Sequence, residues 1–294
     1  MKIRTRWIGI AATALLACSA KDGSSASVGS GSPDGSRAND GGGVVATCTE
    51  GDLATCDYPE RKLASTEQEI AVRDASTGRQ VPLLARIPEG AGPLPVVLWS
   101  HGGGFNAGGH RLGKQWGAAI AGQGYVAIHL AHVPLDAGTG KAVCDAAAIP
   151  AAECTLDAAT TDEDSALVGI VKTLDLLAVL DKLKVLSDES VARGGPALDL
   201  ARVATAGWSA GARGPLMLLG AKVKVTPGAP HFMRPDQRVV AAVGLSTAGP
   251  GFGGYYDDGA ETSFSSMRGP LLIATGQNDV KPTKPELTGT IRRF

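Results

Sequence analysis

The sequence predicts an α/β fold in which a doubly wound, mostly parallel sheet carries helices on both faces. Continuous apolar runs, which are typical of strands buried on both faces, alternate along the chain with segments of helical periodicity. One such run, residues 201–206, leads into Gly-x-Ser-x-Gly at residues 207–211 and then into small residues that can begin a helix. This order is typical of a sharp strand-to-helix turn in an α/β sheet.

The first predicted elements are an antiparallel hairpin and a crossover unit. Residues 67–74 and 80–87 are predicted to be strands joined by a short turn. The apolar run at 95–100, a helix at 112–121 and the apolar run at 125–130 follow. Strand, helix and strand in this order form the crossover that two parallel strands require.

The second half of the chain continues the alternation after a long insertion. Residues 133–160 are expected to be irregular, and a helix is expected to open at the acidic residues 162–164, whose charge suits a helix N-terminus. The strand before the turn is followed by a predicted helix at 210–219 and by strands at 239–245 and 271–275. Seven strands are therefore expected, and no internal repeat is evident.

The N-terminal residues are expected to direct export and not to join the folded domain. Basic residues precede a short apolar run, so residues 1–17 are predicted to be a signal peptide. The residues just before Cys18 resemble a lipobox, in which this cysteine is acylated; an ordinary signal peptide cut nearby is the alternative. Residues 18–44 are rich in Gly and Ser and are predicted to be a flexible tether. We therefore expect an exported protein of the bacterial cell envelope that is lipid-anchored in the membrane.

Four cysteines remain once Cys18 is assigned to lipid, and an exported chain favours two disulfides among them. Three connectivities are possible for Cys48, Cys56, Cys144 and Cys154. The two local pairs, Cys48–Cys56 and Cys144–Cys154, constrain the fold least, because each closes a short loop. A metal site is the rival interpretation, but the spacings contain no Cys-x-x-Cys pair, so no metal is expected. Residues 45–66 are thus a disulfide-containing segment ahead of a domain at 67–294.

The charge of the chain is nearly balanced, with 28 Lys and Arg against 29 Asp and Glu. No basic stripe stands out along the sequence. Nucleic acid is therefore not expected as a partner.

Ser209 is the candidate nucleophile, because it occupies the centre of the Gly-x-Ser-x-Gly turn that forms a nucleophile elbow. Acyl transfer through a serine also needs backbone donors for the oxyanion of the tetrahedral intermediate. The His-Gly-Gly-Gly loop at 101–104 follows the strand expected beside the elbow strand, so the amides of Gly103 and Gly104 are candidates. The amide of Ala210, directly after the nucleophile, is the other predicted donor.

The same glycine loop also fits a dinucleotide-binding fingerprint, with Gly102, Gly104 and Ala107 at the required spacing. That interpretation needs an acidic residue at the end of the next strand, which instead ends in His129, Leu130, Ala131 and His132. A dinucleotide cofactor is therefore disfavoured, and no cofactor is expected.

Asp279 is the candidate acid that would orient a catalytic base. It follows the last apolar strand, where the acid belongs when the chain order is serine, acid and histidine. A plain Asx turn or helix cap is the alternative role, and Asp257 and Asp258 are the fallback acids.

These motifs together resemble the α/β-hydrolase superfamily, and most closely its dienelactone hydrolase-like and platelet-activating factor acetylhydrolase-like branches. The elbow, the glycine loop, residues 124–130 and residues 275–279 carry the resemblance, which extends over residues 67–294. It implies hydrolysis of small-molecule or lipid-like carboxylic esters through an acyl-serine, with no metal or organic cofactor. Dienelactone hydrolases proper have cysteine at the elbow, so Ser209 does not imply that activity. A non-catalytic lipoprotein on the same scaffold, or a serine peptidase or acyltransferase, is the alternative.

The family's catalytic histidine follows its acid, but no histidine follows Asp279 in this sequence. All five histidines precede it and are expected to be structural, with an unusual route to the site left open for His231; they are His101, His110, His129, His132 and His231. We thus expect a hydrolase domain that lacks its last strand and helix, with weak or no activity in this chain.

Overall fold

The computed structural model describes residues 61–156, 165–225, 231–249, 256 and 263–275. The predicted signal peptide, the tether and most of the segment 45–66 lie outside the described residues, and so do Cys18, Cys48 and Cys56. Among the helices in the described parts of the chain, none combines the length and the hydropathy that a membrane span requires.

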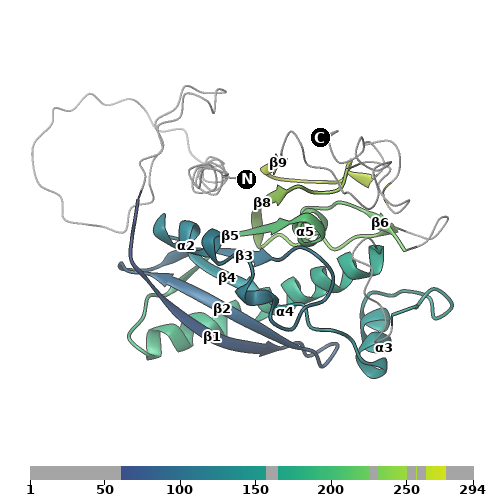
Figure 1. Ribbon diagram of the computed structural model, residues 1–294, viewed down its shortest axis with the longest axis horizontal. Coiled ribbons are helices and arrows are strands. Elements are labelled where there is room, and N and C mark those ends of the chain that lie inside the picture. Colours follow the sequence, from purple (N-terminus) through teal and green to yellow (C-terminus); the bar gives the residue numbers. More distant parts are fainter. Residues whose placement is uncertain (1–60, 157–164, 226–230, 250–255, 257–262, 276–294) are drawn as a thin grey trace, which may run out of the picture.

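A seven-stranded, mostly parallel sheet forms the centre of the molecule (Figure 1), in the order β1-β2-β4-β3-β5-β8-β9. Its strands are β1 (Ser65–Arg73), β2 (Gln80–Pro88), β3 (Leu94–Ser100), β4 (Val126–Leu130), β5 (Leu198–Trp208), β8 (Val239–Leu245) and β9 (Leu271–Ala274). The hairpin strand β2 is antiparallel to both of its neighbours, whereas β4, β3, β5, β8 and β9 run parallel to one another. The predicted α/β class and all seven predicted strands are confirmed.

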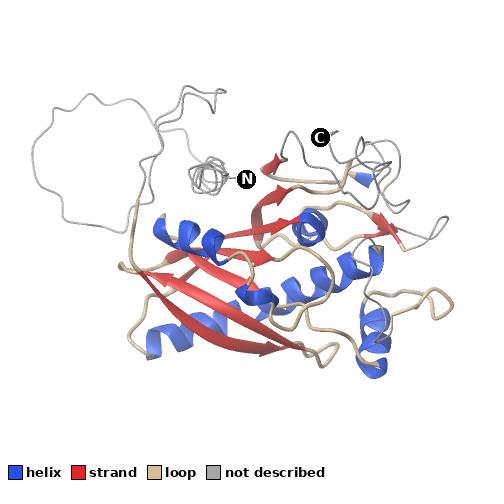
Figure 2. Cartoon of the chain, in the orientation of Figure 1, coloured by secondary structure: helices blue, strands red, loops and turns tan. Residues whose placement is uncertain are grey.

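Helices cover both faces of this sheet, as Figure 2 shows. Alternate side chains of β3 point to opposite faces, because successive residues of a strand do so. Val96 and Leu98 join a core cluster with α4 (Ala166–Ala192), whereas Val97 and Trp99 join another with α2 (Lys114–Gly122). Burial on both faces explains why β3 is a continuous apolar run in the sequence.

The helices differ from expectation at their ends. The predicted helix at 112–121 is α2, which begins two residues later; the short turn η2 (Gly109–Arg111) precedes it, and Gly113 between them has a φ of +67°. The predicted helix at 210–219 is a 3₁₀ turn, η3 (Ser209–Ala212), continued by α5 (Arg213–Leu218). The long helix α4 begins at Ala166, and its N-cap is Ser165, whose hydroxyl accepts a hydrogen bond from the Leu167 amide at 3.2 Å. The acidic residues 162–164 lie outside the described residues.

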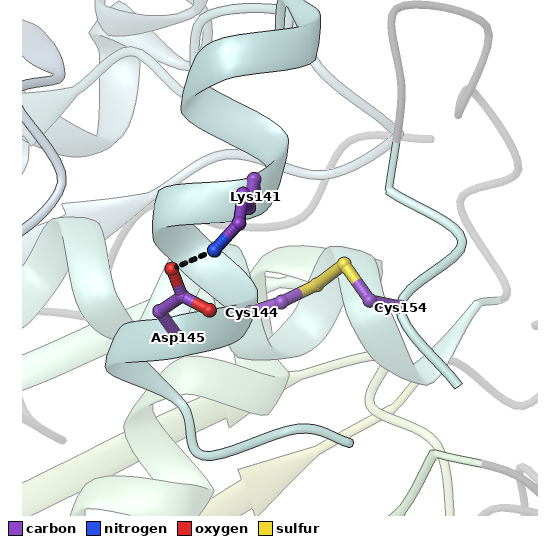
Figure 3. Close-up of a disulfide and its surroundings, with 4 residues drawn as sticks. All are labelled: Lys141, Cys144, Asp145 and Cys154. Carbon is purple, nitrogen blue, oxygen red and sulfur yellow. Dashed lines mark hydrogen bonds and ion pairs between the residues drawn. A yellow bond between two sulfur atoms is a disulfide. The ribbon is translucent and has the colours of Figure 1, made fainter. Parts of the chain in front are cut away.

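The insertion at 133–160 is not irregular, which corrects the sequence prediction. It contains the helix α3 (Ala137–Ala146), whose first turn is closed by a capping box between Asp136 and Thr139. A disulfide joins Cys144 to Cys154, and Lys141 pairs with Asp145 beside it (Figure 3). Of the three connectivities left open by the sequence, this bond agrees only with local pairing.

A two-stranded ribbon, which the sequence did not predict, lies between α5 and β8 in the chain. It pairs β6 (Val223–Lys224) with β7 (His231–Phe232). Phe232 packs in a cluster with α3 and α4 residues, so the ribbon joins the insertion to the rest of the core.

Candidate active site

Ser209 lies at the turn between β5 and the helical segment η3–α5, as the sequence predicted. Its φ is +53°, in the left-handed region that non-glycine residues seldom adopt. Two other non-glycine residues in the described parts of the chain share this conformation, Ala148 and Ser246. A strained backbone persists where the surrounding structure over-determines it, and this occurs often at functional sites.

Close packing on both sides of the serine explains why the turn needs glycines. A Cβ atom on Gly207 would lie 2.3 Å from the carbonyl oxygen of Gly211. A Cβ atom on Gly211 would lie 2.3 Å from the carbonyl oxygens of both Ser100 and His101. Both approaches are far inside van der Waals contact, so the strand and the helix could not pass each other with larger residues.

The glycine loop at 101–104 lies directly against this turn. Its strand, β3, is parallel to β5 and pairs Ser100 with Gly207. Gly102 packs on Trp208, since a Cβ on this glycine would lie 2.8 Å from the indole ring and 3.0 Å from the Trp208 carbonyl oxygen. The structure therefore brings the segment that carries Gly103 and Gly104 beside Ser209 and Ala210. Their predicted catalytic roles remain predictions.

Buried polar side chains of α4 bind the glycine loop, and the sequence did not predict this contact. The ammonium of Lys172, a fully buried residue of α4, donates hydrogen bonds to the carbonyl oxygens of His101 at 2.8 Å and Gly103 at 2.7 Å. Asp175, one turn further along α4, is also fully buried. The available signal was the helix itself, because a helix that is apolar on nearly every side is an internal helix whose charged residues must be paired.

Asp175 connects β3 to the start of β2 through buried side chains. Its carboxylate accepts hydrogen bonds from Arg79 at 3.0 and 3.1 Å and from Nδ1 of His132 at 3.0 Å. Burial acts to raise the pKa of Asp175, but the Arg79 charge and the hydrogen bonds outweigh burial, so the pKa lies below its ordinary value. Nε2 of His132 lies 2.8 Å from Oγ of Ser100.

The His132 ring is neutral in this network. Burial lowers its pKa to about 4, although the hydrogen bond to Asp175 acts in the opposite direction. Since an ionised carboxylate can only accept, Nδ1 carries the proton, and Nε2 accepts from the Ser100 hydroxyl. Ser100, His132 and Asp175 thus have the connectivity of a catalytic triad, but all three are fully buried. They fix the end of β3 and cannot meet a substrate there.

The rings of His101, His110 and His129 are also buried. His101 Nδ1 lies 2.7 Å from the carbonyl oxygen of Gly102, and burial lowers the pKa of His101 to about 3. His129 stacks on Trp99, and His110 is buried. His231 belongs to β7. Asp279, Asp257 and Asp258 lie outside the described residues, so the structure does not test the predicted acid.

Tyr256 is part of the core. It is 1% exposed and lies against Phe264, with ring centroids 4.9 Å apart and the rings tilted by 35°. Burial raises the pKa of Tyr256 to about 12. Trp208, beside the serine, is instead 52% exposed and presents an aromatic surface at the site.

Comparisons with known proteins give distant structural likenesses. The chain is similar to dipeptidyl peptidase 4 from Porphyromonas gingivalis, with 15% identity and a TM-score of 0.44 over 77% of this chain and 30% of that one. A putative dipeptidyl aminopeptidase IV from Bacteroides ovatus gives 16% identity and a TM-score of 0.44, over 82% of this chain and 33% of the other. A bacterial heroin esterase gives 16% identity and a TM-score of 0.37, over 63% and 45%.

The chain thus spans less than half the length of each of these solved chains. No protein-family model matches the sequence, and a search of the curated proteins found no match either.

Proposed function

We propose that this chain is a serine hydrolase that cleaves carboxylic esters through an acyl intermediate on Ser209. The observation that carries the proposal is the left-handed backbone of a half-buried serine, fixed between a buried strand and a helix by two glycines whose Cβ positions are blocked. Such a turn lifts the hydroxyl out of the strand, where a substrate can approach it.

The reaction that fits this geometry has two steps. The Ser209 oxygen attacks the ester carbonyl and loses its proton to a base; the carbon–oxygen bond of the ester breaks, and the alcohol leaves with a proton. Water then attacks the acyl-serine, which releases the acid and regenerates the hydroxyl. The amides of Ala210 and of the glycine loop support the oxyanion in both steps, and Asp279 is the proposed orienting acid.

Labelling with a fluorophosphonate and hydrolysis of p-nitrophenyl acetate test the proposal. We expect slow labelling of Ser209 and weak ester turnover, and we expect Ser209→Ala to abolish both. The matched control is Ser246→Ala, because Ser246 also has a positive φ, at +52°, directly after the neighbouring strand β8. Labelling that survives in Ser209→Ala, or a wild-type chain that is never labelled, would contradict the proposal. Faster turnover of a matched anilide than of the ester would favour a peptidase.

A further inference from the structure

The three consecutive glycines of the loop at 101–104 leave its backbone with little conformational preference of its own. Gly102, Gly103 and Gly104 are consecutive, and glycine loses more backbone freedom on folding than any other residue. Gly103 has a φ of +74°, which glycine adopts as readily as its mirror conformation. Nothing intrinsic to such a segment keeps a given peptide plane turned one way. An oxyanion donor, however, must already point at the reacting oxygen before the reaction begins.

Lys172 supplies the missing constraint. Its ammonium binds the carbonyl oxygens of His101 and Gly103, at 2.8 and 2.7 Å, from within α4. In a trans peptide the carbonyl and the following N–H point in opposite directions. Because the Gly103 carbonyl points toward the Lys172 ammonium, the N–H of Gly104 points away from that ammonium, and the same holds for the N–H of Gly102.

The turn that carries Ser209 fits closely against this loop. Gly102 contacts Trp208, and Gly211 contacts the carbonyl of His101, which is one of the two oxygens that Lys172 binds. The residues on both sides of Ser209 therefore touch the segment whose peptide planes Lys172 fixes. A fully buried ammonium is costly to desolvate, so its presence under a glycine loop calls for a gain other than stability.

We propose that Lys172 is a positioning residue for the oxyanion site. It fixes the Gly103–Gly104 peptide so that the N–H of Gly104 is presented to the developing oxyanion, and its charge polarises that peptide. A hydrogen bond to a carbonyl oxygen strengthens the N–H of the same peptide as a donor. The inference rests on the proposed hydrolase function and adds a residue that touches neither the substrate nor the reacting atoms.

The proposal predicts a specific kinetic change in Lys172→Met, which keeps the length of the side chain and removes the charge. Losing one oxyanion donor typically costs about 100- to 1,000-fold in kcat. We expect about a 100-fold loss in kcat on p-nitrophenyl acetate with KM changed less than about threefold, since the donor acts on the transition state. The rate of fluorophosphonate labelling at Ser209 should fall in parallel, because the phosphoryl oxygen occupies the same site. The control, Lys184→Met, removes an exposed lysine of the same helix and should change neither rate.

The outcomes separate the inference from the function on which it rests. If the wild-type chain labels at Ser209 and folded Lys172→Met labels and turns over equally well, the inference is wrong and the hydrolase function stands. If the wild-type chain neither labels nor turns over ester, both are wrong.

A second measurement uses only the wild-type chain, in case Lys172→Met does not fold. In protein labelled with ¹⁵N-glycine, phosphonylation of Ser209 should move the Gly104 amide proton downfield, as a new hydrogen bond to the phosphoryl oxygen requires. An unchanged Gly104 resonance would overturn the proposal.

Discussion

His129 provides a quantitative test of how buried histidines set the acid stability of this fold. The ring is fully buried on β4, stacks on Trp99 at 5.6 Å between centroids, and lies against Gly117 of α2. Burial, followed by the nearby Arg86 charge, lowers the pKa of His129 to about 3. An unfolded chain restores the ordinary value of 6.5. Between these two values the unfolded state binds a proton that the folded state excludes, so the free energy of unfolding falls as the pH falls.

The size of the effect follows from the two pKa values. At pH 5 the proton taken up by an unfolded His129 destabilises the fold by about 2 kcal/mol, whereas at pH 8 the effect is about zero. His101, with a pKa lowered to about 3, and His132, with a pKa lowered to about 4, act in the same direction. All three rings therefore make the free energy of unfolding fall as the pH drops from 8 to 5.

The variant His129→Phe removes one of these three protons and keeps an aromatic ring in the stack. Within the described residues, Nε2 of His129 has no hydrogen-bond partner, and Nδ1 makes only a 3.3 Å contact with the Leu112 carbonyl. Any change in packing caused by the larger Phe ring is common to both pH values, so it cancels when the two are compared. At pH 5 the variant should be more stable than the wild type by about 2 kcal/mol relative to the difference at pH 8.

Urea unfolding followed by circular dichroism at pH 8, 6 and 5 measures this difference. Trp116→Phe is the matched control, because Trp116 also stacks on Trp99, with ring centroids 5.6 Å apart, and carries no titratable group. Its free energy of unfolding should change with pH by the same amount as that of the wild type. If the same is true of His129→Phe, the His129 ring does not titrate as its burial requires, and the reasoning is wrong.

Two further predictions concern the elbow and the insertion. In Gly211→Ala the new Cβ would overlap two carbonyl oxygens at 2.3 Å, so the turn must shift; we expect about 1–3 kcal/mol of destabilisation and at least a 100-fold loss of esterase activity. Gly122→Ala is the control, since its Cβ meets nothing closer than 3.7 Å; equal activities in the two variants would refute the packing argument. Joint replacement of Cys144 and Cys154 by Ser opens a loop of 10 residues' separation, which should cost about 2.7 kcal/mol and lower Tm by roughly 5–10 °C. An unchanged Tm, or free thiols at both positions in the purified protein, would show that this bond does not form or does not stabilise the fold.

The strands were predictable because a strand that is buried on both faces forms one continuous apolar run in the sequence. β3 and β8 are apolar at nearly every position, since both of their faces are covered, and β8 begins and ends where the sequence predicted. The strand-to-helix turn was predictable for the same local reason: glycines on both sides of a serine leave few other geometries.

The helix α3 was missed because its segment is rich in small residues and lacks a clear apolar face. A local signal was nevertheless present, because Asp136 and Thr139 have the spacing of a helix N-terminal cap. Helix starts are set by such capping residues more than by acidic runs, and Ser165 shows the same for α4.

The buried network could not be predicted from local patterns at all. Arg79, Ser100, His132 and Asp175 come from four separate segments, and only the strand order brings them together. A histidine that follows a strand gives no sign of whether its ring will face solvent, a substrate or a carboxylate. Sequence reasoning could assign these residues to loops and strand ends, and it needed the sheet to show that they meet.

A parallel sheet by itself fixes only part of the site. Neighbouring parallel strands bring the ends of β3 and β5 together, because Ser100 pairs with Gly207, and this sets Ser209 beside the glycine loop. Strand pairing ends at those residues, however, and the glycines beyond it have no conformational preference of their own. Each side therefore needs a separate constraint: steric contact between Gly211 and the carbonyls of Ser100 and His101 fixes the serine turn, and Lys172 fixes the loop. Both constraints act on the carbonyl of His101, so a displacement of that one oxygen would disturb the turn that carries Ser209 and the glycine loop together.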